Sequence, residues 1–391
     1  MIDLGVSVVP NNAIVDINRM SSYDTTIPSL SQTDYLIITN GLFANGAKSI
    51  ADQKSREGYH PTIVDVERVY DHYSYGEVEA RAIQNFVRDV WSTGNKRLKY
   101  LLLIGGDTFD PNNYLGLDQI SFIPSLVAMD QYGSRIPSEN LYVDMNDDGI
   151  PDIAIGRLPV STAEQMDIVA YKIVNQNSLL AMGSGSQLFA VDNQGASDDP
   201  SFRDMAEPIA ASLPHGKTVT WADVGLGAAA AQSTLFNGLM DGMEAVHYFG
   251  HGGYTIWSDD GLLSVSSVDK LANSGVGTVI FTWTCSVQDF QYHLGPCINE
   301  ALLLVPDGGA VATVGPAGVT TTDTQEMLYS QLYLNLTKGM TLGQAIQQAK
   351  ATALTSSKLA QPAVDGWTLL GDPSLCLNWG GSSKGCAATK K

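Results

Sequence analysis

The chain has 391 residues, 44% of them hydrophobic and 16% charged, which is a globular balance that suits one large or two medium domains. Its 22 basic and 41 acidic residues give a net charge of −19, which disfavours nucleic acid and anionic membranes as partners and favours calcium or cationic substrates. No apolar run reaches the roughly 18 residues that a membrane-spanning helix requires, and the N-terminus has no signal-peptide pattern.

The first half of the chain alternates short apolar strands with helices. An extended polar segment at 1–33 precedes strands predicted at 35–39, 62–66 and 100–104 and helices predicted at 44–58, 77–91 and 162–177. This alternation favours an α/β fold, in which helices cover both faces of a mostly parallel sheet. The Gly-Ser run at 183–186 is the best boundary, which gives an N-terminal α/β subdomain at 34–182.

The second half repeats the alternation and predicts another α/β subdomain at 183–378. Strands are expected at 188–191, 218–221 and 310–314 and in the apolar runs that begin at Val246 and Val279, and helices at 202–213, 228–240, 297–304, 325–336 and 341–354. Beyond them, Gly, Ser and Lys dominate, which predicts a flexible tail at 379–391. Cys376 and Cys386 either pair in an oxidising compartment or remain free thiols.

Two of these strands end in reactive side chains, His251 and Cys285. The stretch between them is long enough for a loop, a helix and the return strand, so a right-handed crossover would bring both residues to the same edge of the sheet on neighbouring strands. Glycines 250, 252 and 253 allow a sharp turn and a close approach of substrate. We therefore predict a thiol nucleophile with an imidazole base, whereas either residue alone would more often be a satisfied core residue.

The motifs YFGHG at 248–252, GPCINEAL at 295–302, WTLLGDPSL at 367–375 and DIAIGRLPV at 152–160 accompany this pair. With them the chain resembles the gingipain family of the caspase-like clan of cysteine peptidases, from about 34 to about 377. The resemblance implies a caspase-like three-layer αβα sandwich of two α/β subdomains. It also implies protein or peptide substrates, a secreted or cell-surface location, and a mature or excised catalytic region. The missing signal pattern alone would also fit a cytosolic protein.

A cysteine peptidase needs donors for the oxyanion and a group that orients the base. The backbone N–H groups of Cys285 and Gly252 are our candidate donors, and the resemblance implies the same. It further implies an orienting acid at the end of the first strand of the catalytic subdomain. Asp192 stands there, with Asn193 as the neighbouring alternative and a plain turn residue as the other interpretation.

Substrate preference rests on the resemblance to Arg-specific members, which have an acid about a dozen residues beyond the orienting residue. Asp204 falls there, beside Asp198 and Asp199, and a carboxylate would pair with an Arg or Lys side chain. The aromatic residue that closes the pocket in those members is absent from 316–322, and Asp204 could instead be a helix N-terminal charge. We also assign Trp283 and Thr284 to substrate binding.

An acidic loop at 144–152 is the clearest metal candidate. It has Asp144, Asn146 and Asp148 at positions one, three and five of a calcium loop, Gly at six, Ile150 at seven and Asp152 at nine. Ile155 replaces the Glu at position twelve, so the loop is not an EF-hand. The resemblance implies structural calcium, and the alternative is a solvated acidic turn.

Three functions remain open at this point. The first is a monomeric cysteine endopeptidase that acts through an acyl-enzyme. The second is a sortase-like transpeptidase with the same dyad, which passes the acyl group to an amine instead of water. The third is a catalytically silent surface or binding module, which the intact His251 and Cys285 disfavour.

Overall fold

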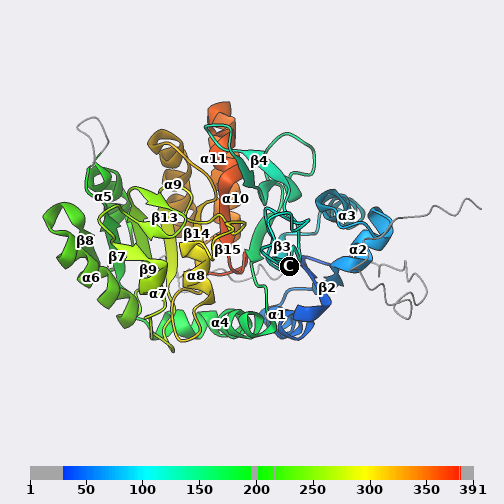
Figure 1. Ribbon diagram of the computed structural model, residues 1–391, viewed down its shortest axis with the longest axis horizontal. Helices are drawn as coiled ribbons and strands as arrows, with labels where there is room; N and C mark the ends of the chain where they lie inside the picture. Colours follow the sequence, from blue (N-terminus) through cyan, green and yellow to red (C-terminus); the bar gives the residue numbers. More distant parts are fainter. Residues whose placement is uncertain (1–29, 195–200, 215, 378, 380–391) are drawn as a thin grey trace, which may run out of the picture.

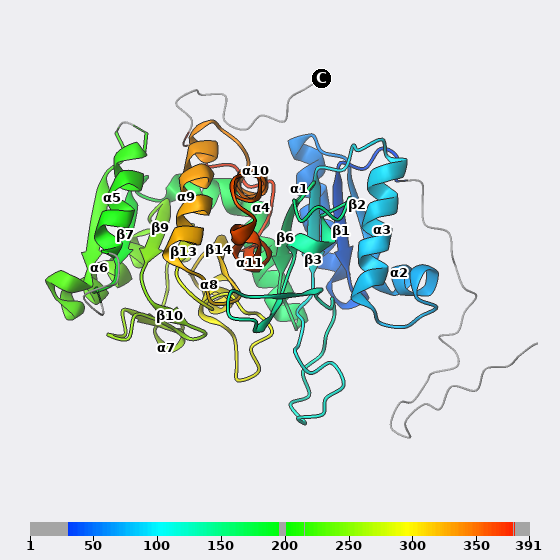
Figure 2. The same cartoon turned by 90° about the horizontal axis from the view of Figure 1, so that it is seen from above.

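The computed structural model describes residues 30–194, 201–214, 216–377 and 379. A ten-stranded sheet runs through the described chain, with helices on both faces (Figures 1 and 2). In spatial order, the strands are β2 (Pro61–Asp65), β1 (Tyr35–Thr39), β3 (Tyr100–Ile104), β6 (Ala154–Leu158), β15 (Trp367–Leu370), β14 (Ala312–Pro316), β13 (Val279–Trp283), β9 (Ala245–Phe249), β7 (Gln187–Val191) and β8 (Val219–Asp223).

Strand β15 joins the two halves of this sheet. It pairs antiparallel with β14 over four residues and parallel with β6 at Leu370 and Arg157. The other neighbours within each half are parallel, so the two halves run in opposite directions. Close packing at this junction requires glycine, because a β-carbon on Gly156 would lie 2.2 Å from the carbonyl oxygen of Gly371.

The helices form the outer layers and pack on four apolar clusters, two for each half of the sheet. In the second half, α5, α9 and α10 cover one face, and α6 and α8 cover the other. In the first half, α2 and α3 cover one face, and α1 and α4 the other. The bounds are α1 (Ala44–Glu57), α2 (Val66–Tyr73), α3 (Ala80–Thr93), α4 (Ala163–Met182), α5 (Phe202–Ser212), α6 (Ala228–Asp241), α7 (Val265–Val268), α8 (Ile298–Leu304), α9 (Thr322–Thr337), α10 (Leu342–Ser356) and α11 (Gln361–Gly366).

A buried carboxylate ties the motif at 367–375 to the first half. Asp372 is fully buried and accepts hydrogen bonds from the hydroxyl of Tyr35 at 2.8 Å and the side-chain amide of Gln176 at 2.7 Å. The ammonium group of Lys54 forms a buried ion pair with the same carboxylate. This motif therefore holds the two halves together.

The predicted three-layer α/β fold with mostly parallel strands is confirmed, although both halves share one sheet. The sequence does not predict β6, β15, α2, α7, α11, the hairpin of β4 (Val127–Met129) and β5 (Arg135–Pro137), or the short strands β10 (Gly252–Gly253), β11 (Ile256–Trp257) and β12 (Leu263–Ser264). Most of these elements are too short to show a clear apolar period, and β15 is defined by partners far away in the sequence. The division at 183 stays a prediction. Phe290, Leu303 and Leu370 follow this boundary in the sequence, yet they pack in an apolar cluster of the first half. Most of 1–33 and of the predicted tail, including Cys386, lies outside the described residues.

In the described part of the chain, no helix combines the length and the apolar composition needed to cross a bilayer.

Candidate active site

The ends of two neighbouring strands carry the predicted dyad. Strands β9 and β13 are parallel and adjacent, with Phe249 opposite Trp283. Just beyond them, the N–H of Gly250 donates to the carbonyl oxygen of Trp283 at 3.3 Å. His251 and Cys285 each stand two residues beyond the Phe249–Trp283 pair. The sheet therefore delivers both residues to one edge at matching positions, which is the arrangement that the apolar runs predict.

The thiol of Cys285 is partly buried and lies beside the loop that follows β14. The N–H of Thr320 points to the sulfur, with 3.5 Å between the nitrogen and Sγ. Burial raises the pKa of the Cys285 thiol; the hydrogen bonds with Thr320 lower it, and the negative charge of Asp130 raises it. The next residue, Ser286, has φ of +52°, a left-handed backbone conformation that is uncommon for serine, directly after Cys285.

His251 presents its ring on a loop whose backbone is fixed. The side chain is exposed, and its ring meets the ring of Phe202 edge-on at 5.1 Å between centroids. Its carbonyl oxygen accepts hydrogen bonds from the hydroxyl of Tyr248 and from the N–H of Ser258 at 3.0 Å. The imidazole can therefore reach a substrate, and its main chain stays in place.

Asp192, the predicted orienting acid, holds this loop through the backbone. The carboxylate is 7% exposed and accepts the N–H of His251 at 3.1 Å and the hydroxyl of Ser258 at 2.6 Å. The N–H of Asn193, its alternative, donates to the same carboxylate at 2.7 Å. Sequence reasoning placed Asp192 against the imidazole, whereas these bonds anchor the main chain of His251. Its role in orienting the ring stays a prediction.

Gly252, the candidate oxyanion donor, has no room for a side chain. A β-carbon there would lie 2.6 Å from Oγ1 of Thr284 and 3.0 Å from Cγ1 of Val287. The backbone of Gly252 thus packs directly on the residue that precedes Cys285. This close contact keeps the two proposed donors on neighbouring parts of one surface.

The assignment of Trp283 and Thr284 to substrate binding stays a prediction, and it could hold only for their main chain, because neither side chain is accessible. Trp283 is 1% exposed, donates its indole N–H to Tyr333 at 3.1 Å and stacks on Trp367. Thr284 is fully buried. A strand that is covered on both faces buries successive side chains, and the sequence pattern of such a strand does not mark an exposed one.

Asp204, the candidate anchor for a basic substrate side chain, lies on the first turn of α5. Its N–H donates to the hydroxyl of Ser201 at 3.2 Å, and its side chain is exposed. This position suits the alternative of a helix N-terminal charge. The neighbouring Asp198 and Asp199 lie outside the described residues, so the anchor stays a prediction.

Asp130 is a residue of this site that sequence reasoning missed. It follows β4 in the first half of the chain, is 5% exposed, and accepts the N–H of Ser134 at 2.8 Å and of Val319 at 3.2 Å. The preceding residue, Gly318, accepts the N–H of Ser286, while the following residue, Thr320, donates to Cys285. The β4–β5 hairpin thus supports the loop that touches Cys285. In the sequence, 130–134 is an ordinary turn, and nothing there points to Cys285.

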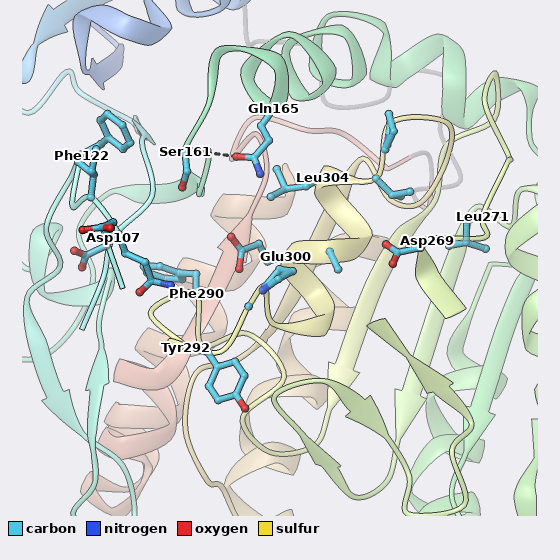
Figure 3. A pocket seen from close by; sticks show the side chains of 18 of the residues that line it. Asp107, Phe122, Ser161, Gln165, Asp269, Leu271, Phe290, Tyr292, Glu300 and Leu304 are labelled. Carbon is cyan, nitrogen blue, oxygen red and sulfur yellow. Dashed lines mark hydrogen bonds between the residues drawn. The ribbon is translucent and has the colours of Figure 1, made fainter. Parts of the chain in front are cut away.

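Residues from both halves of the chain line two cavities. The acidic cavity, of about 570 Å³, is lined by five carboxylates: Asp107, Asp118, Asp269, Glu300 and Asp307. Figure 3 shows Asp107 and Phe122 on one side of it, Asp269 and Leu271 on the other, and Glu300 between them. Burial raises the pKa of Glu300 to about 8.

The aromatic cavity, of about 540 Å³, shares Asp107 and Tyr292 with the acidic cavity. Its lining includes Phe109, Val127, Ile136, Tyr254 and His293. These residues come from a first-half loop, from the β4–β5 hairpin and from the loops that follow His251 and Cys285. Both halves of the chain therefore build it.

The acidic loop at 144–152 turns its carboxylates toward its own backbone. Asp144 accepts the N–H groups of Asp148 at 3.2 Å and Gly149 at 2.8 Å, and Asp148 accepts that of Ile150 at 2.8 Å. Asp152 accepts the N–H of Met145 at 3.0 Å. Across the described residues, no three His, Cys, Asp or Glu side chains converge as metal ligands would. Calcium binding by Asp144, Asn146, Asp148, Ile150 and Asp152 therefore stays a prediction.

Comparison with known proteins places the chain among peptidases. Residues 29–378 match the model of peptidase family C25. Gingipain R2 of Porphyromonas gingivalis is 21% identical over 362 residues, which cover 88% of this chain and 45% of that protein. An uncharacterised protein of Archaeoglobus fulgidus is 22% identical over 325 residues, covering 74% of this chain and 76% of that protein. The chain thus spans less than half the length of the gingipain that it matches.

Solved structures agree on the fold. The Arg-specific cysteine proteinase gingipain R superposes with a TM-score of 0.73 and 20% identity, over 89% of this chain and 79% of that chain. The complex of the pro- and mature domains of RgpB from Porphyromonas gingivalis gives a TM-score of 0.71 and 20% identity, over 88% and 80%. Since the family model covers most of the sequence, the chain belongs to peptidase family C25.

Proposed function

We propose that this protein is a cysteine endopeptidase that cleaves peptide bonds through an acyl-enzyme on Cys285. One observation carries the proposal: adjacent parallel strands, in register at Phe249 and Trp283, end in His251 and Cys285 at one edge of the sheet. A thiol and an imidazole at neighbouring strand ends are the two groups that nucleophilic acyl transfer requires. Membership of family C25 supports the same chemistry.

In the proposed reaction, His251 takes the proton of Cys285 and the thiolate attacks the carbonyl carbon of the scissile bond. The backbone N–H groups of Cys285 and Gly252 stabilise the oxyanion. His251 then gives its proton to the leaving amine, and water hydrolyses the thioester. Because burial and Asp130 raise the pKa of Cys285, the thiolate depends on the nearby imidazolium and on the N–H of Thr320.

The residues around the dyad keep these groups in place. Asp192 fixes the backbone of the His251 loop, and Gly252 packs on Thr284. The loop at 318–320 braces Cys285 from the other side. Such pre-organisation matters, because misplacing a reacting group by about 1 Å can cost about 100-fold in rate.

Substrate preference and location are part of the proposal. The net charge of −19 supports cationic or basic substrates, and Asp204 remains the candidate partner for a basic side chain next to the scissile bond. Family membership supports polypeptide substrates. Secretion or surface display, implied by the resemblance to gingipains, would be tested by fractionation of the producing cells.

A peptide-library cleavage assay tests the function, with wild type, Cys285→Ala and Cys297→Ala side by side. Among the described cysteines, Cys285 and Cys297 are free thiols, and Cys297 is fully buried. We expect cleavage by wild type and by Cys297→Ala but none by Cys285→Ala. An added amine identifies the acyl acceptor. Products that carry the amine in place of hydrolysed products would indicate a transpeptidase. Cleavage that survives Cys285→Ala would refute the proposal.

A further inference from the structure

We infer that the aromatic cavity is a substrate subsite that receives one large apolar side chain, preferably aromatic, of the cleaved polypeptide. This inference rests on the proposed peptidase function and names a side chain that the enzyme selects. It is independent of Asp204, which would select a basic side chain.

The first support is a connected series of aromatic rings on one wall of the cavity. Tyr254 and Tyr292 stack at 4.3 Å between ring centroids, with 8° between the ring planes. Tyr292 meets His293 at 5.5 Å, and His293 meets Phe109 at 5.6 Å. All four rings line the cavity, and Tyr254 and Phe109 are 40% and 57% exposed. Contiguous aromatic surface left in contact with water marks a binding site more often than a structural one.

Aliphatic side chains also line the cavity. Val127 and Ile136 of the β4–β5 hairpin face the cavity together with Pro111 and Pro124. Val127 is 39% exposed. A volume of about 540 Å³ lies within the range of small-molecule pockets, about 300–1,000 Å³. The lining therefore offers an aromatic side chain both rings and aliphatic carbon as contact partners.

The lining also holds polar and charged residues, among them Arg135 and Asp289, and the acid shared with the neighbouring cavity, Asp107, already has partners. The carboxylate of Asp107 accepts the N–H groups of Thr108 at 2.8 Å and Ser125 at 2.7 Å and the side-chain amide of Gln291 at 2.5 Å. Burial raises the pKa of Asp289 to about 6. Because the carboxylate of Asp107 is already held by these donors, the rings and the aliphatic side chains are the surface that the cavity offers to an apolar guest.

Residues that line the cavity are chain neighbours of, or in contact with, segments that flank the proposed dyad. Tyr254 follows Gly252 and Gly253 directly, and its carbonyl oxygen accepts the N–H of Ile298 at 2.7 Å. On the other side, Cγ2 of Ile136 would lie 2.9 Å from a β-carbon on Gly318. The carbonyl oxygen of Gly318 accepts the N–H of Ser286, next to the nucleophile. A polypeptide held at Cys285 would therefore have a neighbouring side chain within reach of the cavity.

The test measures cleavage by wild type, Tyr254→Ala and Val127→Ala, with peptides randomised at each position from P4 to P4′. Tyr171→Ala, which removes an exposed tyrosine from α4, is the matched control. We expect wild type to prefer Phe, Tyr or Leu at one position. Each cavity variant should lose about 10-fold in kcat/KM for peptides with Phe there and less than about 2-fold for peptides with Ala.

Alkylation of Cys285 by iodoacetamide separates this inference from the proposed function. We expect Tyr254→Ala and Val127→Ala to react at the wild-type rate, since a small reagent needs no subsite. Cleavage without a preference for large apolar residues at any position, or with a preference that both variants retain, would overturn the inference alone. No cleavage and no reaction at Cys285 in wild type would instead refute the peptidase function.

Discussion

The catalytic edge at His251 and Cys285 and the acidic loop at 144–152 differ in where their polar groups find partners. At the catalytic edge, the contacts join segments far apart in the sequence: Asp192 holds His251, and Asp130 supports the loop beside Cys285. In the acidic loop, the carboxylates of Asp144 and Asp148 bind amides two to five residues away. Carboxylates that hold distant segments are fixed by the whole fold, whereas carboxylates bound to amides of their own loop can change partners locally. Arg88 of α3 still ties the acidic loop to the fold, because it donates to the carbonyl oxygen of Asp144 and pairs with Asp147.

Removing the proposed nucleophile should have the largest effect on the catalytic edge. Cys285→Ala should lower kcat/KM by at least about 1,000-fold, because covalent catalysis is lost. The free energy of unfolding should change little, since the thiol is only partly buried. Cleavage of a fluorogenic peptide measures the first effect, and urea unfolding measures the second. Equal losses in Cys297→Ala would show that the effect comes from folding.

The next largest effect should come from the carboxylate that anchors the His251 loop. Asp192→Ala leaves the N–H of His251 and the hydroxyl of Ser258 without their acceptor. Lost buried hydrogen bonds of this kind cost about 1–3 kcal/mol each. We therefore expect a lower urea midpoint together with a fall in kcat of roughly 10- to 100-fold, as the base becomes mobile. Asp192→Asn, which keeps one acceptor oxygen, should recover part of the stability; full activity in Asp192→Ala would contradict the proposed anchoring.

Much of the catalytic edge follows from the sequence alone. The apolar runs before His251 and Cys285 are buried on both faces of a parallel sheet, and parallel strands bring their carboxyl ends together. The rest depends on long-range pairing that local patterns do not encode. Strand β15 is inserted between β6 and β14, and Asp130 reaches Val319 from the other half. The burial of Trp283 likewise depends on Trp367 and Tyr333.

A smaller effect is expected from a substitution that changes the pKa of the Cys285 thiol. Asp130→Asn keeps the shape and an acceptor for the N–H of Val319 but removes a negative charge near Cys285. Because that charge raises the pKa of the thiol, its removal should lower this pKa, although burial, the larger cause, persists. In a plot of the rate of Cys285 alkylation against pH, the acid limb, where the rate rises with pH, should then move to lower pH. A limb that moves to higher pH would contradict the assigned role.

The smallest effect concerns the acidic loop. If the loop rearranges to bind calcium, saturating calcium should raise the Tm of wild type relative to EGTA, since a ligand at 100 times its Kd stabilises by about 2.7 kcal/mol. Asp148→Asn removes a charged candidate ligand that is exposed, so it should weaken this shift with little effect on the Tm in EGTA. An identical Tm with and without calcium would leave the loop as a turn closed on its own amides.

Mass spectrometry after treatment with a peptidyl acyloxymethyl ketone tests the central claim most directly, because this reagent needs both a nucleophile and a seated peptide. The account predicts a single adduct on Cys285, strongly reduced in His251→Ala and absent in Cys285→Ala. A wild-type protein that stays unmodified, or that carries the adduct on Cys297, would contradict a dyad at the ends of β9 and β13.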